Sequence, residues 1–331
     1  MKNKILITGA AGFIGSEFLK QSIKQGYSVV AIDKLTYAGD LTRLKEVEKK
    51  YKFYKIDVCD RKRMSTILKK EKPKIIVHFA AETHVDRSIR DATPFIETNV
   101  KGTQVLLDVS RQIKIKKFIH ISTDEVYGEI KKGKFSENSS LCPNSPYSAS
   151  KAAADLIINA YIRTYGFPAI IIRPCNTYGP WQYPEKFIPV ATFKALTNNK
   201  IPVYGDGANR REWLYVSDCA RGILKVMNRG KVGQIYNLGS SYEKKNIDLA
   251  KEIIRVLGKS GSLIDFVKDR SGHDFRYCLD YSKLSGLGWE PQVNFNTGIS
   301  KTIDWYVDNY SWLKEKVKYL RSYWKQVYKS K

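Results

Sequence analysis

The chain has 331 residues, of which 43% are hydrophobic and 12% aromatic. This composition excludes an intrinsically disordered protein, because disordered chains are poor in aromatic and β-branched residues, and the length suits about two domains. The formal net charge of +24 favours anionic partners: nucleic acid, acidic lipid or a phosphorylated small molecule.

The distribution of apolar residues and of cysteines indicates the location of the protein. No run approaches the roughly 18 consecutive apolar residues that a membrane helix needs. The five cysteines are odd in number and form no Cys-x-x-Cys pair, and the four histidines have no ligand-like spacing. These counts argue against a disulfide framework and against a metal site. We therefore expect a cytoplasmic protein without a bound metal.

The first half of the chain alternates short apolar runs with amphipathic segments. The expected strands are Lys4–Thr8, Ser28–Asp33, Lys52–Asp57, Lys74–Phe79, Lys117–Thr123 and Ala169–Arg173. The expected helices lie near 13–26, 61–71, 94–112 and 146–165. This alternation predicts an α/β fold, a doubly wound parallel sheet with helices on both faces.

Beyond about Asn176 the pattern changes to closely spaced prolines and glycines. Such punctuation predicts loops and short elements, not a second regular sheet. Helical patterns resume near 217–228, 246–258 and 295–310. We therefore expect a first domain over 1–175 and a smaller mixed α/β lobe over 176–331, with the chain crossing between them more than once.

The C-terminal tail, residues 311–331, carries seven lysines and arginines and one glutamate, with tryptophans and tyrosines between them. One interpretation is a helix that binds a membrane surface or nucleic acid. The other is a solvated helix whose aromatic side chains pack on the body of the protein or on a partner subunit. We favour the second, because charge runs are usually solvated faces.

A glycine motif follows the first strand. Gly9, Gly12 and Gly15 precede a helical pattern, which is the context of a dinucleotide-binding turn in a Rossmann domain. The helix would direct its N-terminal N–H groups at a pyrophosphate. Asp33 ends the next strand and suits a ribose 2′-hydroxyl, so we predict NAD over NADP, although Lys34 follows directly. The alternative is a glycine turn in a sheet without a ligand.

Asp57, at the end of the third expected strand, has two interpretations. Its carboxylate suits the adenine amino group, and it equally suits the N-terminal cap of the helix expected over 61–71.

Tyr147 and Lys151 stand four residues apart on an expected helix and therefore share a face. A lysine ammonium beside a phenol favours the phenolate, which makes Tyr147 a candidate base toward an alcohol. Thr123, at the end of the preceding strand, strengthens this hypothesis. The alternative for Tyr147 is a packing role at the start of the helix.

Asp124 and Glu125 follow Thr123, where α/β sheets bind ligands. Neighbouring carboxyl groups push their pKa values apart, so that one is protonated while the other is ionised. This pair suits a reaction that removes a carbon-bound proton and expels hydroxide. The alternative is a solvated acidic turn or a helix cap.

These motifs resemble those of the extended short-chain dehydrogenases/reductases that act on nucleotide sugars, and the resemblance covers about residues 3–310. Within that family it is closest to the dTDP-glucose 4,6-dehydratases. The segments that carry it include GAAGFIGS at 9–16, HFAAETHVDRSI at 78–89, STDEVYG at 122–128, SPYSASKAAAD at 145–155, NTYGPWQYPEKFIP at 176–189 and DRSGHDFRYCLD at 269–280.

The resemblance implies a dehydration with no net change in NAD. Tyr147 would take the proton of the sugar 4-hydroxyl, Glu125 the proton at C5, and Asp124 would protonate the departing 6-hydroxyl. Lys151 would also hold the nicotinamide ribose, and Thr123 would bond the sugar near its 4-oxygen. The product would be a 4-keto-6-deoxy sugar nucleotide, a precursor in deoxysugar biosynthesis such as that of rhamnose.

The resemblance also implies which residues bind each ligand. Those expected around NAD are Gly9, Gly12, Phe13, Ile14, Gly15, Asp33, Lys34, Thr36, Asp57, Val58, Ala80, Ala81, Asn99, Tyr147, Lys151 and Thr177. Those expected around the nucleotide sugar are Thr83, Thr123, Asn176, Lys186, Arg211, Asn246, Arg270 and His273. Surface salt bridges are the alternative for the charged members, and Asp86 and Arg87 could equally form a structural ion pair.

Several alternatives stay open. Ala10, Cys175, Thr177, Trp181 and Glu212 depart from the usual family residues, which leaves the nucleotide and the sugar undecided. The same chemistry on UDP-glucose or another nucleotide hexose is one alternative, and a 4-epimerase or UDP-glucuronate decarboxylase is another. A non-catalytic nucleic-acid- or membrane-binding protein is the most distant. We expect a homodimer formed by the helices near 94–112 and 146–165, with neither nucleic acid nor a membrane span.

Overall fold

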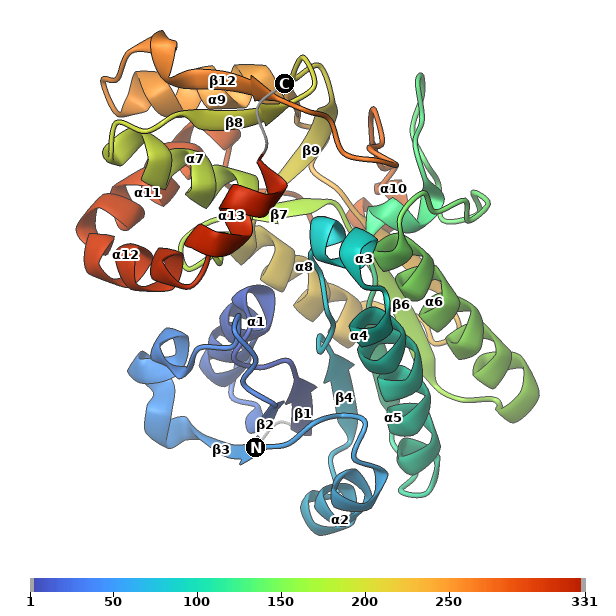
Figure 1. Cartoon of the computed structure of the whole chain (residues 1–331). Helices are drawn as coiled ribbons and strands as arrows, with labels where there is room; N and C mark the ends of the chain where they lie inside the picture. Colours follow the sequence, from blue (N-terminus) through green and yellow to red (C-terminus); the bar gives the residue numbers. More distant parts are fainter. Residues whose placement is uncertain (1–2, 329–331) are drawn as a thin grey trace.

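Seven parallel strands form the central sheet of the computed structural model, which describes residues 3–328 (Figure 1). In spatial order they are β10 (Ile235–Leu238), β6 (Ala169–Pro174), β5 (Lys117–Ile121), β4 (Ile75–His78), β1 (Lys4–Thr8), β2 (Ser28–Asp33) and β3 (Tyr51–Lys55). The strand order reverses at β1, between β2 and β4. Ligands bind at such a switch point, beyond the carboxyl ends of the strands.

Helices cover both faces of this sheet, as the alternating pattern predicted. On one face α1 (Phe13–Lys24) and α8 (Val216–Arg229) enclose a core that contains Phe18 and Ile223. On the other face α2 (Arg61–Glu71), α5 (Gly102–Arg111) and α6 (Pro146–Tyr165) enclose a core that contains Met64, Leu106 and Ile158. Burial on both faces explains why the central strands are almost wholly apolar.

The helix expected over 94–112 is divided. Its backbone runs through α4 (Thr93–Phe95), a π-helical stretch η2 (Ile96–Lys101) and α5. At Gly102, where η2 meets α5, the helix packs closely on Val58. A Cβ at this position would lie 2.8 Å from the Val58 side chain. The short helix α3 (Val85–Arg90) precedes α4.

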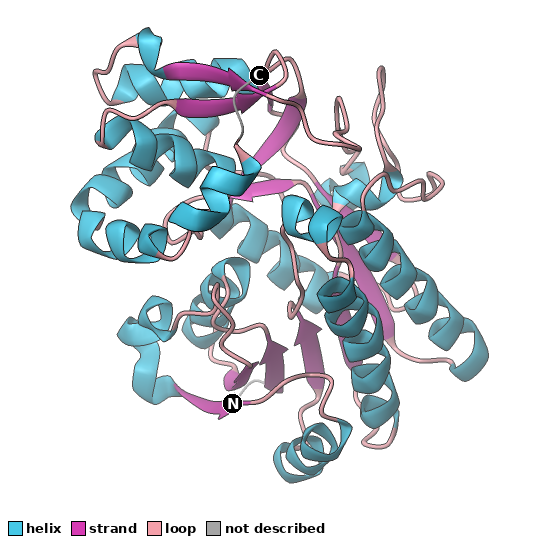
Figure 2. Cartoon of the chain, viewed as in Figure 1, coloured by secondary structure: helices cyan, strands magenta, loops and turns pink. Residues whose placement is uncertain are grey.

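A smaller lobe is set over the carboxyl edge of the sheet (Figure 2). It contains a three-stranded sheet of β7 (Asn176–Tyr178), β9 (Arg210–Tyr215) and β11 (Glu243–Lys245), and a parallel pair of β8 (Ile201–Tyr204) and β12 (Ile264–Val267). Its helices are α7 (Phe187–Leu196), α9 (Asn246–Val256) and α11 (Phe295–Asp308), with α10 (Ser282–Ser285) beside β10. The mixed α/β lobe was predicted, but its two small sheets were not.

The chain returns from the smaller lobe to the central sheet. β10 and α8 both follow residue 176 in sequence, yet β10 extends the seven-stranded sheet beside β6 and α8 packs on α1. Short 3₁₀ segments complete the described elements: η1 (Leu41–Lys50), η3 (Asp124–Tyr127) and η4 (Gly261–Leu263).

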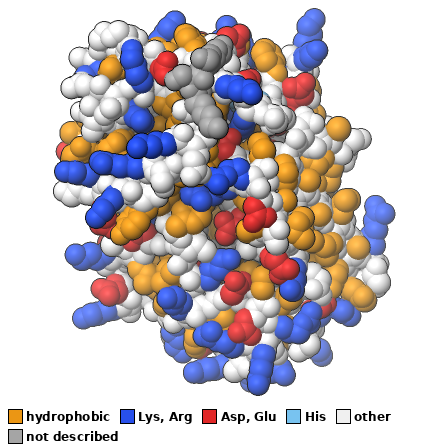
Figure 3. Space-filling view, in the orientation of Figure 1, with side chains coloured by type: hydrophobic (Ala, Val, Ile, Leu, Met, Phe, Trp, Pro, Cys, Tyr) orange, Lys and Arg blue, Asp and Glu red, His pale blue; other side chains and the backbone are white. Residues whose placement is uncertain are grey.

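The tail forms α12 (Tyr310–Lys318) and α13 (Arg321–Val327). Tyr323 and Trp324 are buried against a cluster that includes Tyr183 and Phe193 of the smaller lobe, whereas Tyr319 is 70% exposed. The aromatic side chains therefore pack largely on the body of the protein, and residues 329–331 of the expected tail lie outside the described part. Figure 3 shows lysines and arginines dispersed over this face. Within 3–328, no helix has the length and apolar character to span a membrane.

Candidate active site

The glycine motif forms a tight turn between β1 and α1. Gly9 has a φ of +67°, and a Cβ at this position would lie 2.6 Å from the Ala80 backbone nitrogen. A Cβ on Gly15 would likewise collide with the Gly9 carbonyl. Only glycines allow this close approach, which leaves the start of α1 open to an anion.

Asp33 and Lys34 decide whether this turn suits a free ribose 2′-hydroxyl or a 2′-phosphate. The Asp33 carboxylate accepts hydrogen bonds from the Ala11 and Leu35 backbone nitrogens, at 2.9 and 2.8 Å. Burial raises the Asp33 pKa, while these two hydrogen bonds oppose that rise. The Lys34 ammonium lies 3.5 Å from Asp57 and 3.7 Å from Glu82. Lys34 is thus neutralised by two carboxylates, and the site fits a free ribose 2′-hydroxyl.

A cavity extends from this turn along the carboxyl edge of the sheet. Of the residues expected around NAD, it is lined by Gly9, Gly12, Phe13, Ile14, Gly15, Asp33, Lys34, Thr36, Val58, Ala80, Ala81, Tyr147, Lys151 and Thr177. The residues present therefore fit a bound dinucleotide.

Asp57 and Asn99 do not line this cavity. Asp57 accepts a hydrogen bond from the Cys59 backbone nitrogen at 2.9 Å, and Asp60 caps α2 in its place. The Asn99 amide bonds both backbone groups of Glu82 and the Ser150 hydroxyl. Asp57 and Asn99 instead contact residues that line the cavity: Asp57 contacts Lys34, and Asn99 bonds Glu82.

Tyr147 and Lys151 lie in the first turns of α6, with 7% and 3% of their surfaces exposed. A capping box between Ser145 and Ser148 fixes the start of the helix. The Lys151 ammonium donates to the Ile121 carbonyl at 2.7 Å, and burial lowers its pKa to about 8.

The Tyr147 pKa differs from the expected direction. Burial raises it, and the charge of Glu125 raises it further, while a hydrogen bond with Thr123 opposes the rise. Lys151 is directed toward Ile121, so it does not offset burial here. Because a nearby positive charge stabilises a phenolate, the pKa must fall when an oxidised nicotinamide binds.

Asp124 and Glu125 begin η3, directly after β5. Asp124 is 1% exposed; burial raises its pKa well above the ordinary value, and Glu125 adds to the rise. Burial also raises the Glu125 pKa, but Arg270, Lys186 and Arg211 oppose that effect. Both pKa values are therefore raised, and the three cations near Glu125 make it the more readily ionised of the two carboxyl groups.

A second cavity opens under the smaller lobe and shares Glu125, Asn176 and Lys186 with the first. Glu125 thus stands where the two cavities meet. Of the residues expected around the nucleotide sugar, the second cavity is lined by Asn176, Lys186, Arg211, Asn246, Arg270 and His273. Thr83 and Thr123 line the first cavity.

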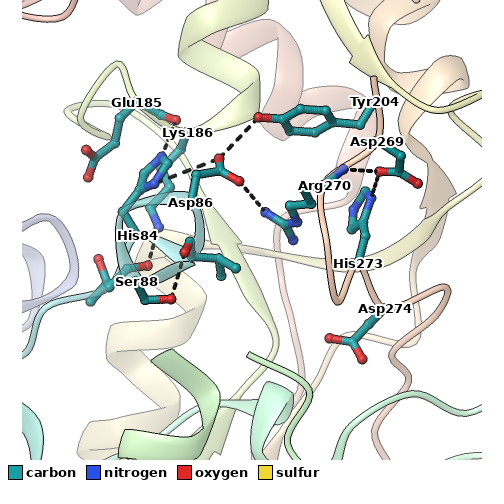
Figure 4. A network of polar contacts seen from close by, with 12 residues as sticks. His84, Asp86, Ser88, Glu185, Lys186, Tyr204, Asp269, Arg270, His273 and Asp274 are labelled. Atoms are coloured by element: carbon teal, nitrogen blue, oxygen red, sulfur yellow. Dashed lines mark hydrogen bonds and ion pairs between the residues drawn. The ribbon is translucent and has the colours of Figure 1, made fainter. Parts of the chain in front are cut away.

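Basic side chains in the second cavity are held by the network in Figure 4. The Arg270 guanidinium lies 3.7 Å from Asp86, and the Tyr204 hydroxyl donates to Asp86 at 3.3 Å. The His273 ring bonds Asp269 at 2.6 Å, and burial lowers the His273 pKa to about 3. Arg211 donates to the Asp274 carbonyl at 2.9 Å. The contacts of Arg270 and Arg211 pre-position two cations for a diphosphate.

Asp86 and Arg87 do not pair with each other, contrary to the structural alternative. Asp86 faces Arg270, whereas the Arg87 guanidinium lies 3.1 Å from Glu185. Adjacent residues in the helix α3 point in different directions, so sequence neighbours of opposite charge need not meet.

Sequence reasoning missed several residues of the cavities. Glu185 lines both cavities, and Tyr204, Trp213, Tyr277 and Tyr328 line the second. Glu185 and Tyr277 lie within the segments that carry the family resemblance, but nothing in their local sequence separates them from packing residues. Within the described part of the chain, no group of three or more potential metal ligands comes together.

Comparison with known proteins agrees with this geometry. The family model described as GDP-mannose 4,6 dehydratase matches residues 6–302. A dTDP-glucose 4,6-dehydratase of Streptomyces niveus is 44% identical over 93% of this chain and 94% of its own length. The Escherichia coli protein of that name is also 44% identical, over 93% and 95% of the two chains.

Solved structures give the same result. The crystal structure of DesIV, a dTDP-glucose 4,6-dehydratase from Streptomyces venezuelae with NAD and TYD bound, has a TM-score of 0.92 and 44% identity. The match covers 95% of this chain and 99% of that one.

Proposed function

The chain belongs to the GDP-mannose 4,6 dehydratase family, and on this premise we propose that it is an NAD-dependent hydro-lyase that converts dTDP-glucose to dTDP-4-keto-6-deoxyglucose and water. The observation that carries the proposal is the position of Glu125. Its carboxylate lies where the cofactor cavity joins the second cavity, next to the buried acid Asp124.

Tyr147 acts first. Its phenolate accepts the proton of the sugar 4-hydroxyl, and Thr123 bonds near the same oxygen. NAD+, when bound, would supply a hydride acceptor at C4 and a hydride donor at C6. Lys151 holds the nicotinamide ribose, and its buried ammonium keeps a positive charge near the reaction. The family resemblance and the burial of these side chains support these roles.

Elimination follows at C5 and C6. The new 4-ketone acidifies the C5 hydrogen, which Glu125 removes as a proton. Asp124 donates its proton to the 6-hydroxyl, which leaves as water. When hydride adds to C6, C5 takes a proton back from Glu125, which exchanges with solvent. The C4 carbon is oxidised and C6 is reduced by the same two electrons, so the cofactor ends as it began. Burial biases Asp124 strongly toward the protonated form that a donor needs, and the cations near Glu125 favour the ionised form that an acceptor needs.

This pair distinguishes a dehydratase from the other enzymes considered on this scaffold. A 4-epimerase removes and returns a hydride at C4 alone and has no use for a second acid and base. A UDP-glucuronate decarboxylase requires a group that binds the substrate carboxylate. The preference for dTDP over UDP is supported by the two relatives described above, which are dTDP-glucose 4,6-dehydratases.

We further propose a homodimer in the cytoplasm. Three large apolar side chains are exposed on the helices expected to form the interface: Ile96, Leu156 and Tyr165, at 50, 59 and 51%. Ile89 of the neighbouring helix α3 is 40% exposed. Apolar residues gathered on one helical surface favour contact with a second subunit. All five cysteines are free thiols, which suits a reducing compartment.

Anaerobic incubation with dTDP-glucose and with UDP-glucose tests the proposal. The alkali-induced absorbance of 4-keto-6-deoxy sugars should develop with dTDP-glucose and more slowly with UDP-glucose. Faster development with UDP-glucose would overturn the nucleotide assignment, and no development with either sugar nucleotide would overturn the dehydratase.

A further inference from the structure

The loop between β2 and η1, residues 34–40, forms one wall of the cofactor cavity. Lys34, Thr36, Ala38 and Gly39 all line that cavity. The position of this loop therefore determines how closely the cavity encloses the adenosine half of a dinucleotide, which Asp33 would bind.

Arg43, which also lines the cavity, anchors this loop. Its side chain is 2% exposed, and it donates to the Ala11 carbonyl at 2.8 Å and to the Ala38 carbonyl at 2.7 Å. It also donates twice to the Trp181 carbonyl of the smaller lobe, at 3.1 and 3.0 Å. One buried guanidinium thus joins the glycine turn, the loop and the smaller lobe.

Asp40, the last residue of the loop, is held by the C-terminal helix α12. Its carboxylate accepts a hydrogen bond from the Trp312 indole nitrogen at 2.9 Å and lies 3.0 Å from the Lys316 ammonium. The Trp312 ring also packs on Trp181, with ring centroids 5.3 Å apart. The two contacts of Asp40 join residues more than 270 positions apart in the chain.

The contacts continue to the ribose-binding carboxylate. The Asp40 backbone nitrogen donates to the Ala11 carbonyl at 3.0 Å, and the Ala11 nitrogen donates to Asp33 at 2.9 Å. Three successive hydrogen bonds therefore lead from Trp312 to Asp33. A helix that served only to cover the smaller lobe would have no need of this connection.

We propose that Trp312 and Lys316 are positioning residues that latch the 34–40 loop over the bound dinucleotide and slow its release. This inference rests on the proposed function. A cofactor that ends each turnover in its starting redox state need not exchange with solvent. If it left early as NADH, the 4-keto intermediate could no longer be reduced at C6. The helix α12 lies outside residues 6–302, which the family model matches.

The test is the dissociation rate of NADH, followed by its fluorescence after mixing with excess NAD+, with no sugar present. The variant Trp312→Phe/Lys316→Met should release NADH roughly tenfold faster, because it loses two contacts to a charged group. Lys318→Met changes an exposed lysine of the same helix and should leave the rate unchanged. Equal rates in the latch variant and the wild-type protein would overturn the latch.

A single substitution shows whether faster release could result from misfolding of the double variant. Lys316→Met alone keeps the Trp312 packing and should raise the rate by a smaller factor in the same direction, with an unchanged circular dichroism spectrum. An unchanged rate in this correctly folded variant also counts against the latch.

The latch and the proposed function fail separately. A protein that dehydrates dTDP-glucose but releases NADH at the wild-type rate in both variants overturns only the latch. Faster release in a protein that never dehydrates the sugar overturns the proposed function. When both hold, the double variant loses activity during turnover, and added NAD+ restores it.

Discussion

The proposed removal of the C5 proton by Glu125 is the step that would separate this enzyme from the epimerases and decarboxylases on the same scaffold. Changing it to glutamine removes the base and keeps the size of the side chain. We expect Glu125→Gln to lower kcat for water loss by roughly 10²–10⁴-fold, the usual contribution of a general base. The measurement is the rate of 4-keto-6-deoxy sugar formation. Glu48→Gln, at an exposed position of η1, is the matched control, and equal rates in the two variants would exclude Glu125 as the base.

Arg270 should set the acid limb of the pH profile. Glu125 works as a base only when ionised, so kcat/KM falls as the pH drops through its pKa, which burial raises above the ordinary glutamate value. Arg270 is the largest opposing influence on that pKa. Arg270→Met removes this positive charge, so the acid limb should move to higher pH.

The comparison variant for that profile is Arg255→Met, on the solvent side of α9, where the side chain is 72% exposed. It should leave the limb in place. A limb that moves equally in both variants, or moves to lower pH in Arg270→Met, would show that another group titrates.

At the scale of the element, α6 places both the phenol and the ammonium. Ser145 caps this helix, since its hydroxyl accepts from the Ser148 nitrogen at 3.1 Å. Ser145→Ala should lower the free energy of unfolding by about 1 kcal/mol, the usual loss for an N-cap. Ser145→Asn keeps an acceptor and should lose less. Denaturant titration measures both, and equal losses would mean that the cap is not what stabilises the start of α6.

Most elements of the central sheet could be predicted because each is a contiguous apolar run or an amphipathic repeat. β1 and β2 begin and end where predicted, and the other predicted strands lie within a few residues of their observed positions. β10 was missed because Asn237 interrupts its short apolar run, and its pairing with β6 depends on the return of the chain. The strands β7 and β11 were also missed, because three residues are too few to show a period.

The candidate site divides in the same way. Residues within one motif, such as Asp124 and Glu125, could be found because they are adjacent in sequence and their side chains have the required chemistry. Glu185 and Tyr204 could not, since only the folded chain brings them to the cavities. Glu212 stands where relatives usually have aspartate; the structure shows its carboxylate accepting from the Ser240 and Leu279 nitrogens, contacts between distant segments that sequence cannot reveal.

At the scale of the whole molecule, residues of both lobes line each cavity, and Glu125 lies where the two cavities meet. The carboxyl edge of the central sheet carries the glycine turn and the proposed acid and base, while the smaller lobe provides Lys186, Arg211 and Arg270 to the second cavity. This arrangement accounts for oxidation, elimination and reduction in one place, because the sugar can face the cofactor while its diphosphate stays held.

The most direct measurement of this account is a reaction of dTDP-glucose in D2O, with the product examined by mass spectrometry and NMR. Proton removal by Glu125 and return from solvent predict one deuterium at C5 of dTDP-4-keto-6-deoxyglucose. A product changed only in configuration at C4, or a deoxy sugar with no deuterium at C5, would contradict the account.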